Sequence, residues 1–342
     1  MARNSRILSI CVLLGCQGGD SADAGASSES SGEESTSSAE GGTEATSAGT
    51  GVETDSASGD GDTSDTASTT GDGDGDGGGD GDGDSECPAL PGFDLVWCDD
   101  FTASDIDATK WGFEVNGQGG GNNELQYYTD RPDNARIEAG KLVIEALEET
   151  YTGDDGTRDY TSARLRTLNM GDWQYGRIEV RARTPEGQGL WPAIWMLPTD
   201  WVYGGWAASG EIDIMELLGH QPQVVYGTLH YGGEWPNNQS SGENTAWGTH
   251  GYTLQQGDFA DDFHVFAIEW EAEEIRWYVD GEHFQTQDSW YSDAGAFPAP
   301  FDQDFHLILN VAVGGNWPGA PDDSTVFPQR MEVDWVRVYQ PA

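Results

Sequence analysis

Three carboxylates stand within six residues of an otherwise apolar run at positions 210–219. On a regular strand side chains alternate between faces, so Glu211 and Asp213 share a face and Glu216 points the other way. One β-bulge at 214–215 absorbs the extra residue and returns Glu216 to the face of the other acids. Two carboxyl groups about 5 to 5.5 Å apart across a glycosidic bond suit a retaining glycoside hydrolase, as nucleophile and proton donor. The alternative is a solvated strand face, but such faces usually mix Lys, Thr and Arg with their acids.

The run Glu-Ile-Asp-Ile-Met-Glu resembles the active-site signature of glycoside hydrolase family 16, in the bulged form of its laminarinase-like (endo-β-1,3-glucanase) members. Residues 190–197 (LWPAIWML) and 314–319 (GGNWPG) fit the same family. The resemblance covers roughly residues 93–340. It implies that Glu211 is the nucleophile, Glu216 the acid/base and Asp213 the helper between them.

Short alternating runs, punctuated by Gly, Asn, Asp and Pro, predict an all-β sandwich. Ile178 begins an alternation of apolar and charged residues that is typical of a strand with one solvated face. Asp280-Gly281 supplies the turn of a predicted hairpin, and residues 305–313 and 331–339 predict two more strands. The family resemblance implies a concanavalin-like β-jelly-roll of two antiparallel sheets, with the substrate cleft across the concave sheet.

Three polar residues are candidates for substrate binding. Asn123 lies in a loop that resembles the family's substrate-facing loop and is expected to offer an amide to sugar hydroxyls, unless it only forms a turn beside glycines. Arg164 matches a family position that lines the negative subsites, although a lone Arg is more often a surface residue. His230 follows the catalytic strand and is expected to hydrogen-bond substrate in the cleft.

Three tryptophans are candidates for stacking on sugar rings. Trp191 and Trp195 share a face if their segment is a strand, and flat aromatic faces stack on the apolar faces of pyranose rings. Core packing is the alternative. Trp206 is bracketed by two glycines and a polar segment, which favours exposure in the cleft. The family usually has Pro after this Trp, whereas Ala207 stands here, and we expect that departure to loosen the loop without altering the chemistry.

No cofactor is required by these residues. The six histidines are scattered without the i, i+2 or i, i+4 spacing of metal ligands. The family resemblance implies a structural calcium ion held by Asp334 and the backbone carbonyls of Gly140 and Asp100. Oxygen ligands from three distant segments leave almost no sequence signal of their own.

The first 15 residues are expected to be a lipoprotein signal peptide. Arg3 and Arg6 precede the apolar run 7–14, and the ending Leu-Leu-Gly-Cys looks like a bacterial lipobox. Cleavage before Cys16 would leave a lipidated thiol that anchors the exported protein to a membrane, at the outer membrane or cell surface. An ordinary signal peptide with a coincidental cysteine is the alternative. The apolar run is shorter than the roughly 18 residues of a membrane-spanning helix.

Residues 16–86 are predicted to be a disordered linker, because Gly, Ser, Thr, Ala, Asp and Glu dominate and cannot bury enough apolar surface to fold. The Asp-Gly tail at 71–84 lacks the ligand pattern of an EF-hand. Residues 87–342 form the predicted catalytic domain. Cys87 and Cys98 are expected to form one disulfide after export, the alternative being two reduced thiols.

The formal charge of −46 and the presence of only two lysines disfavour a nucleic-acid partner. The expected partners are a β-glucan substrate and the membrane reached through the lipid anchor, and the chain is expected to be a monomer.

The sequence thus predicts a retaining, endo-acting hydrolase of laminarin-like β-1,3-glucan or related β-glucans. Glu216 would start protonated and donate to the leaving oxygen while Glu211 attacks the anomeric carbon. One alternative is the same scaffold acting on mixed-linkage glucan, agar or carrageenan. The bulged motif counts against mixed-linkage glucan, and the scarcity of basic residues counts against sulfated galactans. Another is a non-catalytic glucan-binding lectin on the cell surface, which the presence of all three acids disfavours.

Overall fold

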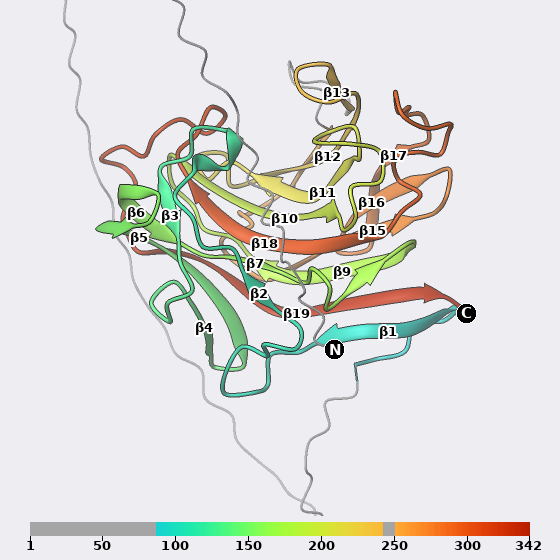
Figure 1. Ribbon diagram of the computed structural model, residues 1–342. Coiled ribbons are helices and arrows are strands. Elements are labelled where there is room, and N and C mark those ends of the chain that lie inside the picture. The colour runs from blue at the N-terminus through green and yellow to red at the C-terminus, as the bar shows by residue number, and fades with distance from the viewer. Residues whose placement is uncertain (1–86, 242–249) are drawn as a thin grey trace, which may run out of the picture. The chain divides into compact units, whose positions relative to one another are not determined.

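The computed structural model describes residues 87–241 and 250–342, which form two stacked β-sheets (Figure 1). In the described residues the larger sheet has ten strands in the order β17-β16-β15-β9-β19-β5-β6-β3, with β1 paired to β19 and β4 to β5. Their bounds are β1 Phe93–Asp99, β3 Gln126–Tyr128, β4 Ala135–Glu138, β5 Lys141–Gly153, β6 Gly156–Ser162, β9 Gly176–Arg183, β15 His264–Trp270, β16 Ile275–Val279, β17 Glu282–Gln287 and β19 Gln329–Pro341.

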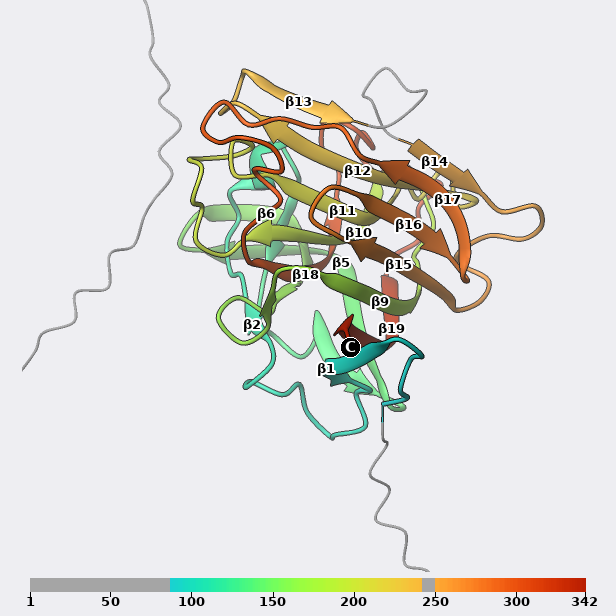
Figure 2. The same ribbon diagram turned by 90° about the vertical axis from the view of Figure 1, so that its right-hand side faces the viewer.

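The second sheet has nine strands within the same described residues, in the order β13-β12-β11-β10-β18-β7-β2, with β14 paired to β12 and β8 to β18. Figure 2 shows its central strands side by side. The bounds are β2 Gly112–Phe113, β7 Arg164–Arg166, β8 Asp172–Trp173, β10 Leu190–Pro198, β11 Glu211–Leu217, β12 Val224–Gly232, β13 Asn238–Ser241, β14 His250–Thr253 and β18 Phe305–Val313.

The predicted all-β jelly-roll class is confirmed. The one helical element among the described residues is a short 3-10 turn, η1, at Gly119–Gly121. Among the described strands all pairings are antiparallel except that of β3 with β6, which is parallel. The predicted hairpin joins β16 to β17, and Asp280 and Gly281 adopt φ values of 51° and 79° at its turn.

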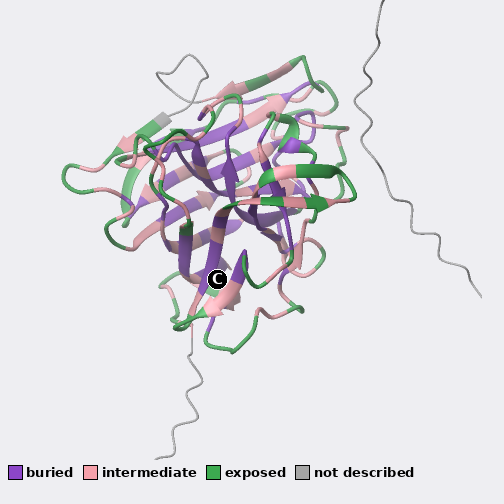
Figure 3. Cartoon of the chain, turned by 90° about the vertical axis from the view of Figure 1, so that its left-hand side faces the viewer, coloured by how far each residue is buried: buried purple, intermediate pink, exposed green. Residues whose placement is uncertain are grey.

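The core lies between the sheets and is filled by alternate strand residues (Figure 3). On β9 Ile178, Val180 and Ala182 are buried while the charged residues between them are half-buried, as the alternation predicts. Trp277 of the larger sheet reaches across, and its Nε1 donates a hydrogen bond to the carbonyl of Asp213, at 2.8 Å. This contact ties β11 (Glu211–Leu217) to the opposite sheet.

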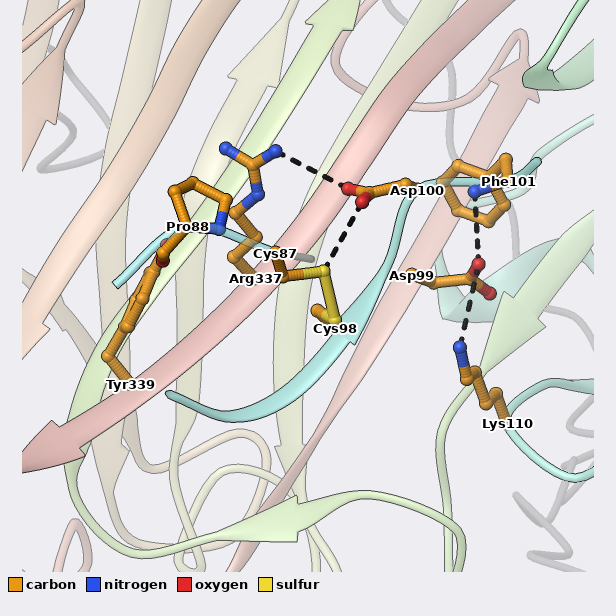
Figure 4. Close-up of a disulfide and its surroundings, with 9 residues drawn as sticks. All are labelled: Cys87, Pro88, Cys98, Asp99, Asp100, Phe101, Lys110, Arg337 and Tyr339. Atoms are coloured by element: carbon orange, nitrogen blue, oxygen red, sulfur yellow. Dashed lines mark hydrogen bonds and ion pairs between the residues drawn. A yellow bond between two sulfur atoms is a disulfide. The ribbon is translucent and has the colours of Figure 1, made fainter. Parts of the chain in front are cut away.

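A disulfide joins Cys87 to Cys98, with Cα atoms 6.5 Å apart, at the start of the described chain (Figure 4). Nearby, Tyr339 Oη donates to the carbonyl of Pro88 at 3.1 Å. The bridge and this hydrogen bond hold the beginning of the domain beside the last strand. On the chain-entropy model, closing so short a loop contributes about 3 kcal/mol.

The predicted signal peptide 1–15, the lipidation site Cys16 and the linker 16–86 lie outside the described residues. Within the part of the chain that is described, the structure contains no helix with both the length and the apolar character needed to cross a bilayer.

Candidate active site

The predicted bulge is present in β11. On β10, Ala193 faces Glu216 and Trp195 faces Asp213, so two residue steps on β10 match three on β11. The pairing with β12 shifts in the same interval. The extra residue restores Glu216 to the face of Glu211 and Asp213, because one inserted residue reverses the alternation. All three acids therefore share the sheet face turned away from the core.

Glu211 is largely buried beneath two ring systems. Trp206 Nε1 donates a hydrogen bond to Glu211 Oε2 at 2.7 Å, and His230 Nε2 lies 3.6 Å from Oε1. Burial, and then the proximity of Asp213, raises the pKa of Glu211 to about 8, against the lowering effect of His230 and the indole N–H.

Glu216 is buried and is held by a second indole. Trp191 Nε1 donates to Glu216 Oε1 at 2.9 Å. Burial, followed by the proximity of Asp213, raises the pKa of Glu216 to about 8. The two glutamates therefore have the same kind of environment, each with one N–H donor from a tryptophan.

Asp213 lies between the glutamates and is only 2% exposed. Burial raises its pKa well above the usual value. Three carboxyl groups buried side by side cannot all be charged at once, so the trio shares protons and titrates as a coupled set. A group of this kind can offer both a proton donor and a nucleophile at the same pH.

His230 faces the acids from β12. Its Nδ1 lies 2.8 Å from Ser240 Oγ on β13, and its Nε2 lies 3.2 Å from Asp213 Oδ2. The imidazole also packs beside Trp206, with ring centroids 5.5 Å apart. The structure thus places the predicted His230 within reach of two of the three predicted catalytic residues.

Aromatic rings surround the acids, and sequence reasoning missed two of them. Trp317 packs edge-on against Trp191, with centroids 5.4 Å apart. Trp235 is 64% exposed and lies 6.3 Å from Trp206. Trp317 belongs to the 314–319 motif, and this motif could have identified it as a residue near the site. Trp235 carried no signal beyond its residue type.

Trp195 and Arg164 belong to one network of half-buried and buried side chains. The Arg164 guanidinium is stacked 4.6 Å from the Tyr128 ring and 5.3 Å from the Trp195 ring. Trp195 Nε1 donates to Asn310 Oδ1 at 2.7 Å, and Asn310 Nδ2 donates to the Tyr128 hydroxyl at 3.2 Å. Arg164 also lies 3.7 Å from Glu124. The Arg164 side chain is only 11% exposed and stacks beside Trp195, so the alternative of a solvated surface residue is wrong. The sequence carried no specific signal for Tyr128, Glu124 or Asn310.

Asn123 lies at an exposed turn. It adopts φ 58°, which fits the turn-forming alternative. Its amide nitrogen donates to Asn316 Oδ1 at 2.9 Å and so joins two loops. Its role in binding substrate stays a prediction.

The predicted calcium site draws on three segments: Asp334 lies in β19, Gly140 directly precedes β5, and Asp100 directly follows β1. The pairing of β19 with β5 ends at Val333 and Leu142, and its pairing with β1 ends at Val336 and Asp99, so Gly140 and Asp100 lie next to the segment of β19 that contains Asp334. One carboxylate and two carbonyls suit calcium, a hard cation that takes oxygen ligands. Arg181 already donates a hydrogen bond to the Asp334 carboxylate, and Arg337 donates to Asp100 at 3.4 Å. The calcium ion at Asp334 stays a prediction.

A β-sandwich with coupled, buried carboxylates beneath indole rings defines a glycoside hydrolase of the paired-carboxylate class. Residues 121–337 match the profile described as Glycosyl hydrolases family 16, and the chain belongs to that family.

Named relatives agree with this assignment. The chain is 47% identical to "Beta-glucanase" of Rhodothermus marinus over 259 residues, covering 73% of this chain and 86% of the relative. It is 44% identical to "Glucan endo-1,3-beta-glucosidase A1" of Niallia circulans, covering 74% of this chain but only 39% of that longer protein. The X-ray structure of the laminarinase from Rhodothermus marinus superposes with a TM-score of 0.64 at 45% identity, covering 74% of this chain and all of that one.

Proposed function

We propose that this protein is an endo-acting, retaining glycoside hydrolase that cleaves laminarin-like β-1,3-glucan. The observation that carries the proposal is the bulged strand, which sets Glu211 and Glu216 on one face on either side of Asp213. The names of the relatives, an endo-1,3-β-glucosidase, a β-glucanase and a laminarinase, support the substrate.

In the first step Glu216, protonated, donates its proton to the glycosidic oxygen while Glu211 attacks the anomeric carbon. The bond from that carbon to Glu211 forms as its bond to the leaving oxygen breaks. The Trp206 N–H favours the ionised form of Glu211, since it donates to a carboxylate oxygen. Burial raises the pKa of Asp213 well above its usual value, and in its protonated form Asp213 can donate a hydrogen bond to Glu211.

In the second step a water molecule attacks the anomeric carbon of the glycosyl-enzyme. Glu216, now ionised, takes a proton from the water, and Glu211 leaves as a carboxylate. Two inversions at the same carbon give a product that keeps the β configuration. Glu216 thereby returns to its protonated state, ready for the next substrate.

Azide rescue tests the two roles separately, with an aryl β-1,3-linked glucoside as substrate. Glu216→Ala should form glycosyl-enzyme that azide traps as a β-glycosyl azide. Glu211→Ala should give the α-glycosyl azide, because azide then replaces the nucleophile directly. Glu273→Ala, in the exposed turn between β15 and β16, is the matched control and should retain wild-type turnover. Near wild-type turnover in both active-site variants would refute the assignment.

The alternative substrates are tested by the same enzyme on a panel of polysaccharides. Laminarin should be cleaved to a range of oligosaccharides from the start of the reaction, since an endo-acting enzyme cuts within chains. Faster cleavage of mixed-linkage glucan, agar or carrageenan would move the assignment to that substrate. Laminarin binding without any cleavage would support the lectin.

We also propose that the protein is exported as a monomer and anchored through a lipid on Cys16, at the outer membrane or cell surface. The lipobox-like ending of the apolar run supports the anchor. Incorporation of labelled palmitate by the full chain in a bacterial host, and its loss in Cys16→Ala, tests it. Light scattering of the detergent-free Cys16→Ala protein tests the monomer.

A further inference from the structure

Two of the acids and the histidine also form a compact set of potential metal ligands. One ligand atom from each of Glu211, Asp213 and His230 lies within 4.8 Å of the other two. In the part of the chain that the structure describes, this is the one group of three or more such residues. Its position over the proposed nucleophile means that any ion held there would occupy the reaction centre.

Two of the three distances between ligand atoms are close to those around a tetrahedral ion, and the third, between the two carboxylates, is at most 4.8 Å. His230 Nε2 lies 3.2 Å from Asp213 Oδ2 and 3.6 Å from Glu211 Oε1. Zinc binds imidazole nitrogen and carboxylate oxygen at about 2.0–2.1 Å, which places tetrahedral ligand atoms about 3.3–3.4 Å from one another. The observed distances lie on either side of that spacing. Three protein ligands leave a fourth position for water, as in open zinc sites.

An unsatisfied oxygen points independently to a cation. Asp213 Oδ2 is buried and accepts no hydrogen bond, although Asp213 is only 2% exposed. Despite its closeness to His230 Nε2, no hydrogen bond forms between these atoms. A buried acceptor without a partner costs about 1–3 kcal/mol. A cation between Asp213 and His230 would remove that cost.

The imidazole is also oriented for metal binding. Ser240 Oγ lies 2.8 Å from His230 Nδ1 on the side away from the acids. If Nδ1 carries the proton and donates it to Ser240, Nε2 presents its lone pair to the acids. Metal-bound histidines almost always have such a partner at the other ring nitrogen, and it fixes both tautomer and ring orientation.

We propose that Glu211, Asp213 and His230 form an inhibitory site for one Zn²⁺ ion. Imidazole with carboxylates at low coordination number suits zinc, whereas calcium and magnesium take six or more oxygen ligands. The bound ion would occupy an oxygen of Glu211 and so block its attack on the anomeric carbon. Zinc and glucan would then exclude each other. The inhibition rests on the proposed function, whereas the binding does not.

Isothermal titration calorimetry of the full chain with zinc chloride tests the binding. We expect a saturable one-to-one phase, which tenfold excess magnesium chloride does not displace. His230→Gln removes a ligand and should weaken that phase by more than tenfold. Ser240→Ala removes only the partner of the imidazole and should weaken it by roughly 10–100-fold. His283→Gln, an exposed histidine hydrogen-bonded to Thr286, is the matched control and should bind as the wild type does.

Far-UV circular dichroism shows whether each variant is folded. If His230→Gln does not fold, the zinc affinity of Ser240→Ala still decides the test. Absence of a one-to-one phase, or wild-type affinity in both His230→Gln and Ser240→Ala, would overturn the zinc site. Inhibition is measured by laminarin hydrolysis at rising zinc, and the apparent inhibition constant should increase in proportion to substrate. Zinc bound one-to-one with unchanged hydrolysis would refute the inhibitory role. Zinc binding in a protein that leaves laminarin intact would keep the site and refute the glucanase.

Discussion

The two indole N–H groups provide a direct test of which glutamate does what. Trp206→Phe keeps an aromatic ring beside Glu211 but removes the N–H that donates to Oε2 at 2.7 Å. The hydrogen bond stabilises the charged carboxylate, so its loss raises the pKa of Glu211. Since Glu211 must be ionised to attack, the acid limb of the kcat/KM profile should move to higher pH.

The size of the shift follows from the strength of the bond. A hydrogen bond to a charged group contributes about 1.5–3 kcal/mol, and one pKa unit corresponds to about 1.4 kcal/mol. The acid limb should therefore move up by about 1–2 pH units. Below the limb, that shift reduces kcat/KM by about 10- to 100-fold in addition to any loss of substrate stacking.

Trp191→Phe is the matched comparison because it removes the equivalent donor, 2.9 Å from Glu216 Oε1. A higher pKa of Glu216 keeps the proton donor protonated to higher pH, so the basic limb should move up and the acid limb stay. The assay is kcat/KM on laminarin between about pH 4 and 10, where the two limbs report the coupled carboxyls of the free enzyme. If Trp206→Phe moves the basic limb instead, the roles of Glu211 and Glu216 are exchanged. If neither variant moves a limb, the indoles do not control ionisation.

Three further changes test packing, substrate positioning and metal binding. Gly227→Ala would place a Cβ 2.5 Å from Cδ1 of Trp277. Because the core has no room for it, the substitution should lower the free energy of unfolding in urea by about 1–3 kcal/mol. Unchanged stability would contradict the close packing of the sheets. Asn310→Ala removes the oxygen that accepts a hydrogen bond from Trp195, and it should raise KM for laminarin several-fold with a smaller change in kcat. A several-fold fall in kcat with an unchanged KM would contradict a positioning role. Calcium should raise Tm over a chelator-treated sample by a few degrees, and Asp334→Ala should abolish the difference; equal Tm values in the wild type would refute the site.

The bulged strand β11 could be predicted from the sequence because the residue pattern that marks it lies within a few consecutive positions. The alternation of residues and one extra position between the acids were enough to place the bulge, and the register with β10 and β12 confirms it. The strand limits at 305–313 agree with β18, which is a continuous, mostly apolar run. Those at 331–339 lie within β19, where apolar residues are interspersed with charged ones. Short-range patterns therefore predicted the all-β class and several strands, whereas the jelly-roll arrangement came from the family resemblance.

The network around Arg164 could not be predicted, because its members lie far apart in the chain. Asn310 and Tyr128 are 182 positions apart and meet only after the sheet has formed. The parallel pairing of β3 with β6 is likewise a product of tertiary packing. That Asp213 Oδ2 accepts no hydrogen bond depends on its burial and on the orientation of the His230 ring. Neither can be predicted from the spacing of residues in the sequence.

The central claim is that Glu211 and Glu216 act by double displacement on β-1,3-glucan. A proton NMR time course of the protein with laminarin tests it most directly, because the first minutes show which anomer is released. We predict that the β-anomer forms first and then drifts to the equilibrium mixture. Initial release of the α-anomer would mean inversion and would contradict the roles assigned to both glutamates.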